Sequence, residues 1–199
     1  MFEALVVGVS AGGLRALTEI LPKLPKGYPL AILIVQHRHR DSDNFLTEHL
    51  NELSSVCVKE AELREAILPA HVYIAPAGYH LLVERDKTLS LSIDPPVNFS
   101  IPSIDVLFQS AATCYKNRLV GLILTGANSD GSQGLKFVKD YGGFAIVQAP
   151  NTAEVDVMPR AAIDLVDVDK VVPLEELAAF LTQARFKQNS TVVREKLDE

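Results

Sequence analysis

The stretch Leu5-Val6-Val7-Gly8-Val9-Ser10-Ala11-Gly12-Gly13 places a serine directly after an apolar run and between glycines. The apolar run predicts a buried β-strand, and residues 14–21 predict the helix that follows it. A sharp turn between them exposes the Ser10 hydroxyl, and the new helix offers unpaired N–H groups where negative charge develops. The turn fits the G-x-S-x-G pattern of a nucleophilic serine. A phosphate-binding loop or an ordinary tight turn is the alternative, because short motifs often match by chance.

Apolar runs and amphipathic stretches alternate along the chain. Continuously apolar runs are typical of strands that are buried on both faces of a sheet. The predicted strands cover residues 5–9, 31–36, 56–58, 72–75, 119–125 and 144–148. The predicted helices cover residues 14–21, 43–53, 103–117, 132–141, 159–164 and 174–185. This alternation predicts an α/β fold with a doubly wound, mostly parallel sheet and helices on both faces.

A hairpin and two other segments complete the predicted organisation. Residues 81–84 and 89–93 predict an antiparallel hairpin on one edge of the sheet. The proline-rich residues 94–102 predict a surface loop. We expect residues 1–185 to form one catalytic domain and the polar residues 186–199 to form a loosely held C-terminal tail.

The composition of the 199-residue chain narrows the class of protein. With 48% hydrophobic residues, the chain is long enough to bury a full core in one domain. The formal net charge of −6 argues against a nucleic-acid surface and provides no global field that attracts an acidic partner. No apolar stretch approaches the ~20 residues of a membrane span, so we expect no membrane insertion.

The N-terminus and the cysteines indicate a cytoplasmic protein. The first residues lack the basic region of a signal peptide. Cys57 and Cys114 form no metal or redox pattern, and we expect two small buried residues in a reducing compartment. No His, Cys and Glu cluster has metal-ligand spacing, and the glycines around Ser10 fit neither nucleotide-binding motif. We therefore expect neither a metal nor a cofactor.

Three polar residues follow predicted strands at the edge where α/β proteins bind ligands. Ser10 follows the first strand, His37 follows residues 31–36, and Asp130 follows residues 119–125 through a short loop. If these strands are adjacent and parallel, His37 can take the proton from Ser10, and Asp130 can orient His37 and stabilise the imidazolium. The backbone N–H of Ala11 or of its neighbours is then the expected donor to the oxyanion.

Each member of this set has an alternative explanation. His37 can be a strand-end histidine bonded to a carbonyl, and Asp130 before a glycine is ordinary turn chemistry. His39 is the second candidate for the base, because it would share a face with His37 if the strand continued. His80 follows a turn that can reach the same edge of the sheet. We expect the remaining histidines, His49 and His71, to be structural or to face solvent.

Several different sequence motifs follow one another along nearly the whole chain. They are Gly8-Val9-Ser10-Ala11-Gly12-Gly13, Gln36-His37, Val72-Tyr73-Ile74-Ala75-Pro76, Pro102-Ser103-Ile104-Asp105-Val106-Leu107-Phe108, Leu124-Thr125-Gly126-Ala127-Asn128-Ser129-Asp130-Gly131 and Met158-Pro159-Arg160-Ala161-Ala162. Together they resemble the catalytic domain of chemotaxis protein-glutamate methylesterases. The resemblance implies a doubly wound α/β domain that hydrolyses glutamate methyl esters on chemoreceptors, releases methanol and deamidates certain glutamines. It maps a serine, histidine and aspartate triad onto Ser10, His37 and Asp130.

The resemblance has departures that bear on regulation and substrate. Full-length members of the family usually carry a receiver domain before the catalytic domain, and here we expect none. Ala127 stands where the family has a methionine, and if that position gives its backbone N–H to the oxyanion, alanine can still do so. The basic cluster that the family has before Pro102 is replaced by Asn98-Phe99-Ser100-Ile101. We therefore expect the loop of residues 94–102 to recognise substrate by apolar contact, unless Phe99 and Ile101 only pack the loop down.

The expected function is a serine hydrolase of the methylesterase type. Its expected partner is the cytoplasmic region of a methylated chemoreceptor or another modified protein. An esterase or amidase with a different substrate is one alternative, and a catalytically idle binding module of the same fold is another. Labelling of Ser10 by a serine-directed fluorophosphonate probe separates the enzyme from the idle module.

Overall fold

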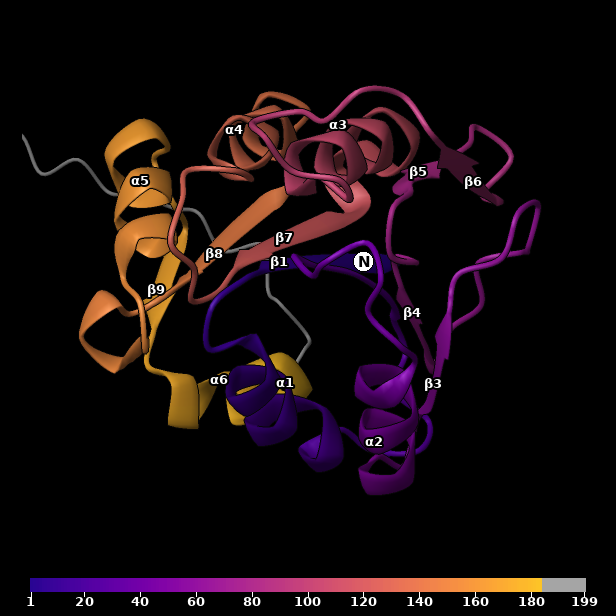
Figure 1. Cartoon of the computed structure of the whole chain (residues 1–199). Helices are drawn as coiled ribbons and strands as arrows, with labels where there is room; N and C mark the ends of the chain where they lie inside the picture. Colours follow the sequence, from indigo (N-terminus) through magenta and orange to yellow (C-terminus); the bar gives the residue numbers. More distant parts are fainter. Residues whose placement is uncertain (184–199) are drawn as a thin grey trace, which may run out of the picture.

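The structure is a computed structural model, and it describes residues 1–183. A seven-stranded parallel sheet forms its centre, with the strand order β3-β4-β2-β1-β7-β8-β9 (Figure 1). The strands of this sheet are β1 (Ala4–Val9), β2 (Ala31–Gln36), β3 (Cys57–Glu60), β4 (His71–Ile74), β7 (Leu119–Ile123), β8 (Phe144–Gln148) and β9 (Lys170–Val172). A separate antiparallel pair consists of β5 (His80–Val83) and β6 (Leu89–Ser92).

Helices cover both faces of the sheet (Figure 1). The helices are α1 (Gly13–Ile20), α2 (Phe45–Leu53), α3 (Ile104–Tyr115), α4 (Ser132–Asp140), α5 (Val157–Leu165) and α6 (Leu174–Thr182). Short 3₁₀ turns are η1 (Leu21–Lys23), η2 (Lys116–Arg118) and η3 (Pro150–Thr152). Helices α3, α4 and α5 lie on one face, and α1, α2 and α6 lie on the other. The fold class predicted from the alternating pattern is therefore confirmed.

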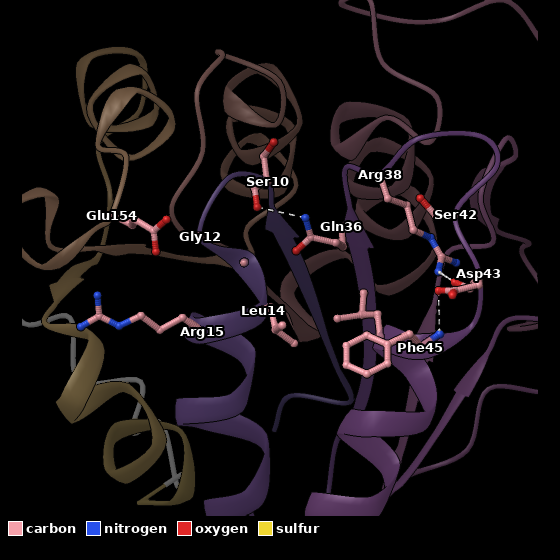
Figure 2. Close-up of a pocket in the computed structure, with 12 residues that line it drawn as sticks. Ser10, Gly12, Leu14, Arg15, Gln36, Arg38, Ser42, Asp43, Phe45 and Glu154 are labelled. Carbon is pink, nitrogen blue, oxygen red and sulfur yellow. Dashed lines mark hydrogen bonds between the residues drawn. The ribbon is translucent and has the colours of Figure 1, made fainter.

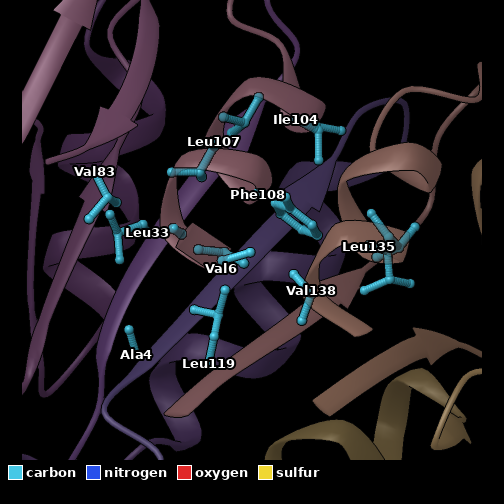
Figure 3. Packing of buried hydrophobic residues seen from close by; sticks show 14 of the residues in the cluster. Ala4, Val6, Leu33, Val83, Ile104, Leu107, Phe108, Leu119, Leu135 and Val138 are labelled. Carbon is cyan, nitrogen blue, oxygen red and sulfur yellow. The ribbon is translucent and has the colours of Figure 1, made fainter. Parts of the chain in front are cut away.

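Strand β1 is apolar throughout because its side chains enter two cores. Ala4 and Val6 belong to the core under α3 and α4, where Phe108 and Leu135 pack against the sheet (Figure 3). The alternate residues, with Val7 among them, belong to the core under α1, α2 and α6. Because successive side chains of a strand point to opposite faces, a strand between two helical layers needs an unbroken apolar run.

The order of the strands creates a crevice at the end of β1. Strand β1 pairs with β2 on one side and with β7 on the other, and both pairings are parallel. The chain first moves outward from β1 to β2 and beyond, and later returns to the opposite side of β1 as β7. Such a reversal of direction leaves a crevice beyond the carboxyl ends of the two strands. Ser10 follows β1 at this point.

Some details differ from the sequence-based expectations. The hairpin is present, but it forms a sheet of its own against α3 instead of extending the large sheet. Strand β9 was not predicted. Cys57 was expected to be buried but is exposed, because it begins edge strand β3, where the next residue, Val58, points inward instead. Cys114 is partly buried, and both cysteines are free thiols. The expected boundary at 185 and the tail of residues 186–199 lie outside the described residues.

Two further observations concern the described part of the chain. Within residues 1–183, no helix combines the length and the apolar character that crossing a membrane requires. In the same residues, His, Cys, Asp and Glu side chains form no group of three or more that could hold a metal ion.

Candidate active site

The carboxyl ends of β1, β2 and β7 bring the predicted site residues to one edge of the sheet. The Ser10 N–H donates to the Thr125 carbonyl oxygen at 3.0 Å, which joins the turn after β1 to the loop after β7. The His37 N–H donates to the Val9 carbonyl oxygen at 3.0 Å, so His37 begins its loop directly beside β1. Asp130 lies in the turn that opens α4. The predicted adjacency of the three strands is therefore found.

His37 and Asp130 are in direct contact. The His37 Nε2 atom lies 2.8 Å from Asp130 Oδ2. Asp130 is fully buried, whereas 13% of the His37 side chain remains exposed. An acceptor at Nε2 fixes the proton of a neutral imidazole there, and this leaves Nδ1 as the basic nitrogen. Among residues 1–183, neither Nδ1 nor the Ser10 hydroxyl makes a hydrogen bond, so Ser10 and His37 are not joined in this structure.

Asp130 is held by donors from the start of α3. The backbone N–H groups of Ile104 and Asp105 donate to its carboxylate at 2.7 and 3.2 Å, and the Ser103 hydroxyl donates at 2.9 Å. Asn98 Nδ2 adds a contact of 3.2 Å. Burial raises the pKa of Asp130, but hydrogen bonds from His37, Ile104 and Asn98 and the nearby His37 charge outweigh burial and leave it below the usual value. The carboxylate therefore stays ionised beside His37.

Gly8 in β1 allows the first turn of α3 to lie close to the sheet. A Cβ atom at Gly8 would lie 2.4 Å from Ile104 Cγ2, which is far inside van der Waals contact. Any larger residue at position 8 would push the first turn of α3 away from the sheet. The N–H groups that hold Asp130 belong to that turn. Gly8 therefore contributes to the site through packing as well as through the turn around Ser10.

A second buried carboxylate, Asp105, lies beside Asp130. Its Oδ1 atom accepts the N–H groups of Gly131 and Gly134 at the start of α4, at 2.9 and 2.6 Å. Its Oδ2 atom accepts Asn98 Nδ2 at 2.6 Å. Burial and the charge of Asp130 raise the pKa of Asp105, although these hydrogen bonds oppose the shift. Asp105 thus ties α3, α4 and the loop around Asn98 into one network.

The turn after β1 presents Ser10 with free N–H groups nearby. Gly12 has a φ of 79°, a left-handed conformation that glycine adopts without steric cost. The Thr125 hydroxyl lies 2.8 Å from the Ala11 carbonyl oxygen and fixes this turn against the loop after β7. Within residues 1–183, the N–H groups of Ala11 and Ala127 have no acceptor. Both residues are exposed, as donors to a bound oxyanion must be.

A pocket of about 560 Å³ begins at Ser10 and extends between α1 and α2. Figure 2 shows Ser10 at its upper end, with Glu154 and Arg15 on one side and Arg38 and Phe45 on the other. Leu14 and Phe45 are exposed apolar side chains in its wall. Its lining includes Ser10 and stops short of His37 and Asp130. Ser10 therefore lies in the lining of an open hollow that His37 and Asp130 do not line.

The other histidines differ in their relation to the site. The His39 side chain, the second candidate for the base, is 81% exposed and contacts Asp41 instead of Asp130. His49 stacks on Phe45, and His71 bonds the Pro69 carbonyl oxygen. His80 is buried and does reach the same region. Its Nδ1 atom accepts the Ser103 N–H at 3.1 Å, and its Nε2 atom lies 3.2 Å from the Pro95 carbonyl oxygen.

Through these two contacts, His80 holds the base of the loop of residues 94–102, which leads into α3. We expect His80→Ala to lower the free energy of unfolding by about 2 kcal/mol, because it leaves the buried Ser103 N–H unpaired. His80→Asn should lose less, because its amide oxygen lies near the position of Nδ1. Urea denaturation of the two variants and the wild type measures the difference. Equal stability of all three proteins would show that the Ser103 contact contributes nothing.

The sequence did not reveal the residues that hold Asp130. Asn98 was treated as part of a surface loop, and Asp105 appeared only within the motif around Pro102 and Ser103. The helix predicted over residues 103–117 did place its start where the donors of α3 begin. The contacts themselves join residues 25 to 32 positions apart along the chain.

Comparison with known proteins gives a consistent result. Residues 5–181 match the protein family described as CheB methylesterase. A protein of Leptospira interrogans named putative protein-glutamate methylesterase/protein-glutamine glutaminase is 51% identical over 189 residues, which are 95% of this chain and 97% of that protein. A protein-glutamate methylesterase/protein-glutamine glutaminase of Symbiobacterium thermophilum is 37% identical over 90% of this chain but only 49% of its own length. The chain therefore spans about half of that longer relative.

A solved structure has the same fold. The crystal structure of the Thermotoga maritima CheB methylesterase catalytic domain superimposes with a TM-score of 0.88 at 35% sequence identity. The match covers 92% of this chain and 98% of the Thermotoga chain.

Proposed function

The chain belongs to the CheB methylesterase family, and we propose that it hydrolyses glutamate γ-methyl esters on a protein and deamidates glutamine side chains, with Ser10 as the nucleophile. The names of the Leptospira and Symbiobacterium relatives support both reactions. The observation that carries the proposal is the contact between His37 and the buried Asp130 behind the exposed turn of Ser10. The proposed substrate is the cytoplasmic region of a methylated chemoreceptor.

The reaction begins with attack of Ser10 Oγ on the ester carbonyl carbon. His37 Nδ1 accepts the hydroxyl proton, and ionised Asp130 stabilises the resulting imidazolium through Nε2. The carbonyl oxygen becomes an oxyanion, which the N–H groups of Ala11 and Ala127 stabilise. The C–O bond to the methoxy group then breaks, and the leaving oxygen takes the proton from His37 and departs as methanol. An acyl ester on Ser10 remains.

Water completes the cycle. His37 removes a proton from a water molecule, whose oxygen attacks the acyl carbon. The bond to Ser10 Oγ then breaks, and the proton returns from His37 to Ser10. The product is a glutamic acid side chain, which loses its proton to solvent and becomes a carboxylate. With glutamine as substrate the same steps release ammonia in place of methanol, so one arrangement of residues serves both reactions.

Methanol release from a chemoreceptor cytoplasmic fragment that has been methylated enzymatically tests this function. We expect the purified chain to release methanol, to release ammonia from a glutamine-bearing fragment, and to react at Ser10 with a fluorophosphonate. Labelling without methanol release would indicate an esterase or amidase with another substrate. Neither labelling nor release would indicate an idle module and would contradict the proposal.

The reaction should also depend on pH in a defined direction. His37 must be neutral to accept the serine proton, so the rate of methanol release should fall as the pH is lowered from about 8 to about 5. Asp130 should not limit the reaction there, because its pKa lies below the usual value of a carboxyl group. A pH-independent rate of methanol release across this range would contradict the role of His37.

A further inference from the structure

An aromatic side chain is presented next to the residues that hold Asp130. Phe99 lies in the loop of residues 94–102 and is 103% exposed, which means that no other part of the described chain covers its ring. The alternative that Phe99 only packs the loop down is therefore wrong for this residue, whereas Ile101 is partly buried. A single exposed apolar side chain is common on a protein surface, so the exposure of Phe99 gains weight only together with the backbone that carries it.

The backbone under Phe99 is a tight turn that disfavours phenylalanine. Val97 and Ser100 exchange both backbone hydrogen bonds, at 3.1 and 2.9 Å. The two residues between them, Asn98 and Phe99, have φ values of 50° and 60°. These are the features of a type I′ turn, in which the second central position strongly favours glycine. A bulky residue in this left-handed region costs conformational energy, and such strain is commonly found at functional positions.

The turn is fixed at both its base and its tip. At the base, buried His80 contacts the Pro95 carbonyl oxygen and the Ser103 N–H. At the tip, Asn98 Nδ2 contacts Asp105 at 2.6 Å and Asp130 at 3.2 Å. Asp130 is the carboxylate that holds His37. The exposure of Phe99 is therefore not the result of a loose loop, because the neighbouring residue anchors the turn to the site itself.

The uncharged and partly apolar character of the turn indicates which kind of surface Phe99 contacts. Residues 97–100 carry no charge, and the chain as a whole has a net charge of −6, so attraction to an acidic protein is not the source of affinity here. Val97, in the same turn, and Ile93, just before the loop, are also exposed apolar side chains, at 37% and 78%. An aromatic ring on a rigid turn loses little conformational entropy on binding, which makes it an effective anchor.

We propose that Phe99 is a specificity-determining residue that contacts an apolar surface of the substrate protein next to the reacting glutamate side chain. This inference rests on the proposed function, because it assigns the ring to the same substrate. A small ester such as p-nitrophenyl acetate carries no protein surface for Phe99 to contact. Phe99 should therefore affect the choice between a protein substrate and a small ester, and not the chemical step.

The test compares two substrates for the wild type, Phe99→Gly and Phe99→Tyr. We expect Phe99→Gly to lower the ratio of kcat/KM for the methylated receptor fragment to kcat/KM for p-nitrophenyl acetate by about tenfold, mainly through KM, since a buried ring contributes on this scale. Phe99→Tyr retains the ring and should keep most of the ratio. Phe137→Ala is the matched control, because it removes another exposed phenylalanine, on α4, and should leave the ratio unchanged.

The melting temperature of Phe99→Gly is a second measurement. It would change in the opposite direction if the ring of Phe99 packed within the protein. Phe99→Gly relieves the left-handed backbone, so its melting temperature should rise by about 2–4 °C. A clear fall would mean that the ring packs within the protein, and it would overturn the proposal. An unchanged ratio in Phe99→Gly, with an active wild type, would overturn the role of Phe99 alone. A wild type that hydrolyses the small ester but releases no methanol would overturn the proposed function, and this assignment with it.

Discussion

Ser10→Ala should reduce methanol release from the methylated receptor fragment by about 10⁴-fold or more. Without the hydroxyl, no covalent acyl intermediate forms, and only the residual catalysis by the surrounding donors remains. The fold should be unaffected, because the Ser10 hydroxyl makes no hydrogen bond within residues 1–183 and its loss leaves no partner unpaired. Methanol release measured with the same substrate and the circular dichroism melting curve test the two halves of this expectation.

Ser129→Ala is the matched control for that experiment. Ser129 is an exposed serine in the loop before Asp130, and its side chain has no part in the proposed reaction. We expect it to retain wild-type activity and to leave the fluorophosphonate label on Ser10. If Ser10→Ala kept even one tenth of the wild-type rate, or if the label moved to another serine, the assignment of the nucleophile would be wrong.

The elements of the fold were predictable because local pattern determines them. β1 and β2 are apolar at almost every position, and only a strand between two helical layers tolerates that pattern. An apolar run could not reveal β9, because only one of its three residues, Val172, is buried. The place of the hairpin was also mistaken. Its strands were recognised, but their packing against α3 depends on contacts that no local pattern encodes.

The site was partly predictable for a related reason. Ser10, His37 and Asp130 each follow a strand, and the general rule for parallel sheets places them at one edge. Which strands are adjacent could only be assumed until the order β2-β1-β7 was known. The choice of His37 over His39 then follows from geometry, since only His37 contacts Asp130. Because Asp130 contacts Nε2 of His37, the other ring nitrogen, Nδ1, is the basic one.

The support around Asp130 was not predictable from local sequence. Asp105 has the position of an ordinary acidic residue in the first turn of a helix, a place that usually faces solvent. Here it is buried, because glycines at the start of α4 allow α3 to lie close: a Cβ at Gly134 would be 3.0 Å from Asp105 Cα. The network of Asn98, Asp105 and Asp130 therefore depends on the approach of two helices.

His37→Ala and Asp130→Asn should each lower kcat for methanol release by about 10³-fold or more, and the double variant should lose little beyond the larger single effect. The two residues act as one unit: without Asp130 the imidazole loses the acceptor that fixes its tautomer, and without His37 the carboxylate has nothing to orient. His39→Ala is the matched control, because its ring is 81% exposed and does not contact Asp130. A large effect of His39→Ala with a mild effect of His37→Ala would reverse the assignment.

Asp130→Asn should also change the acid sensitivity of the fold, with a sign that the pKa of Asp130 determines. In the folded protein this pKa lies below its usual value, so the folded state keeps the carboxylate ionised at lower pH than the unfolded chain does. Ionised Asp130 thus stabilises the fold above the unfolded value, about 3.9, and this contribution is lost as pH falls through the lower folded value. In Asp130→Asn, the free energy of unfolding should be lower at pH 7 and should decrease less steeply below about pH 4. Urea denaturation at a series of pH values measures both. Parallel curves for the two proteins would mean that the hydrogen bonds to Asp130 do not favour its charged form, and His37 would then lack the ionised partner that the proposed reaction requires.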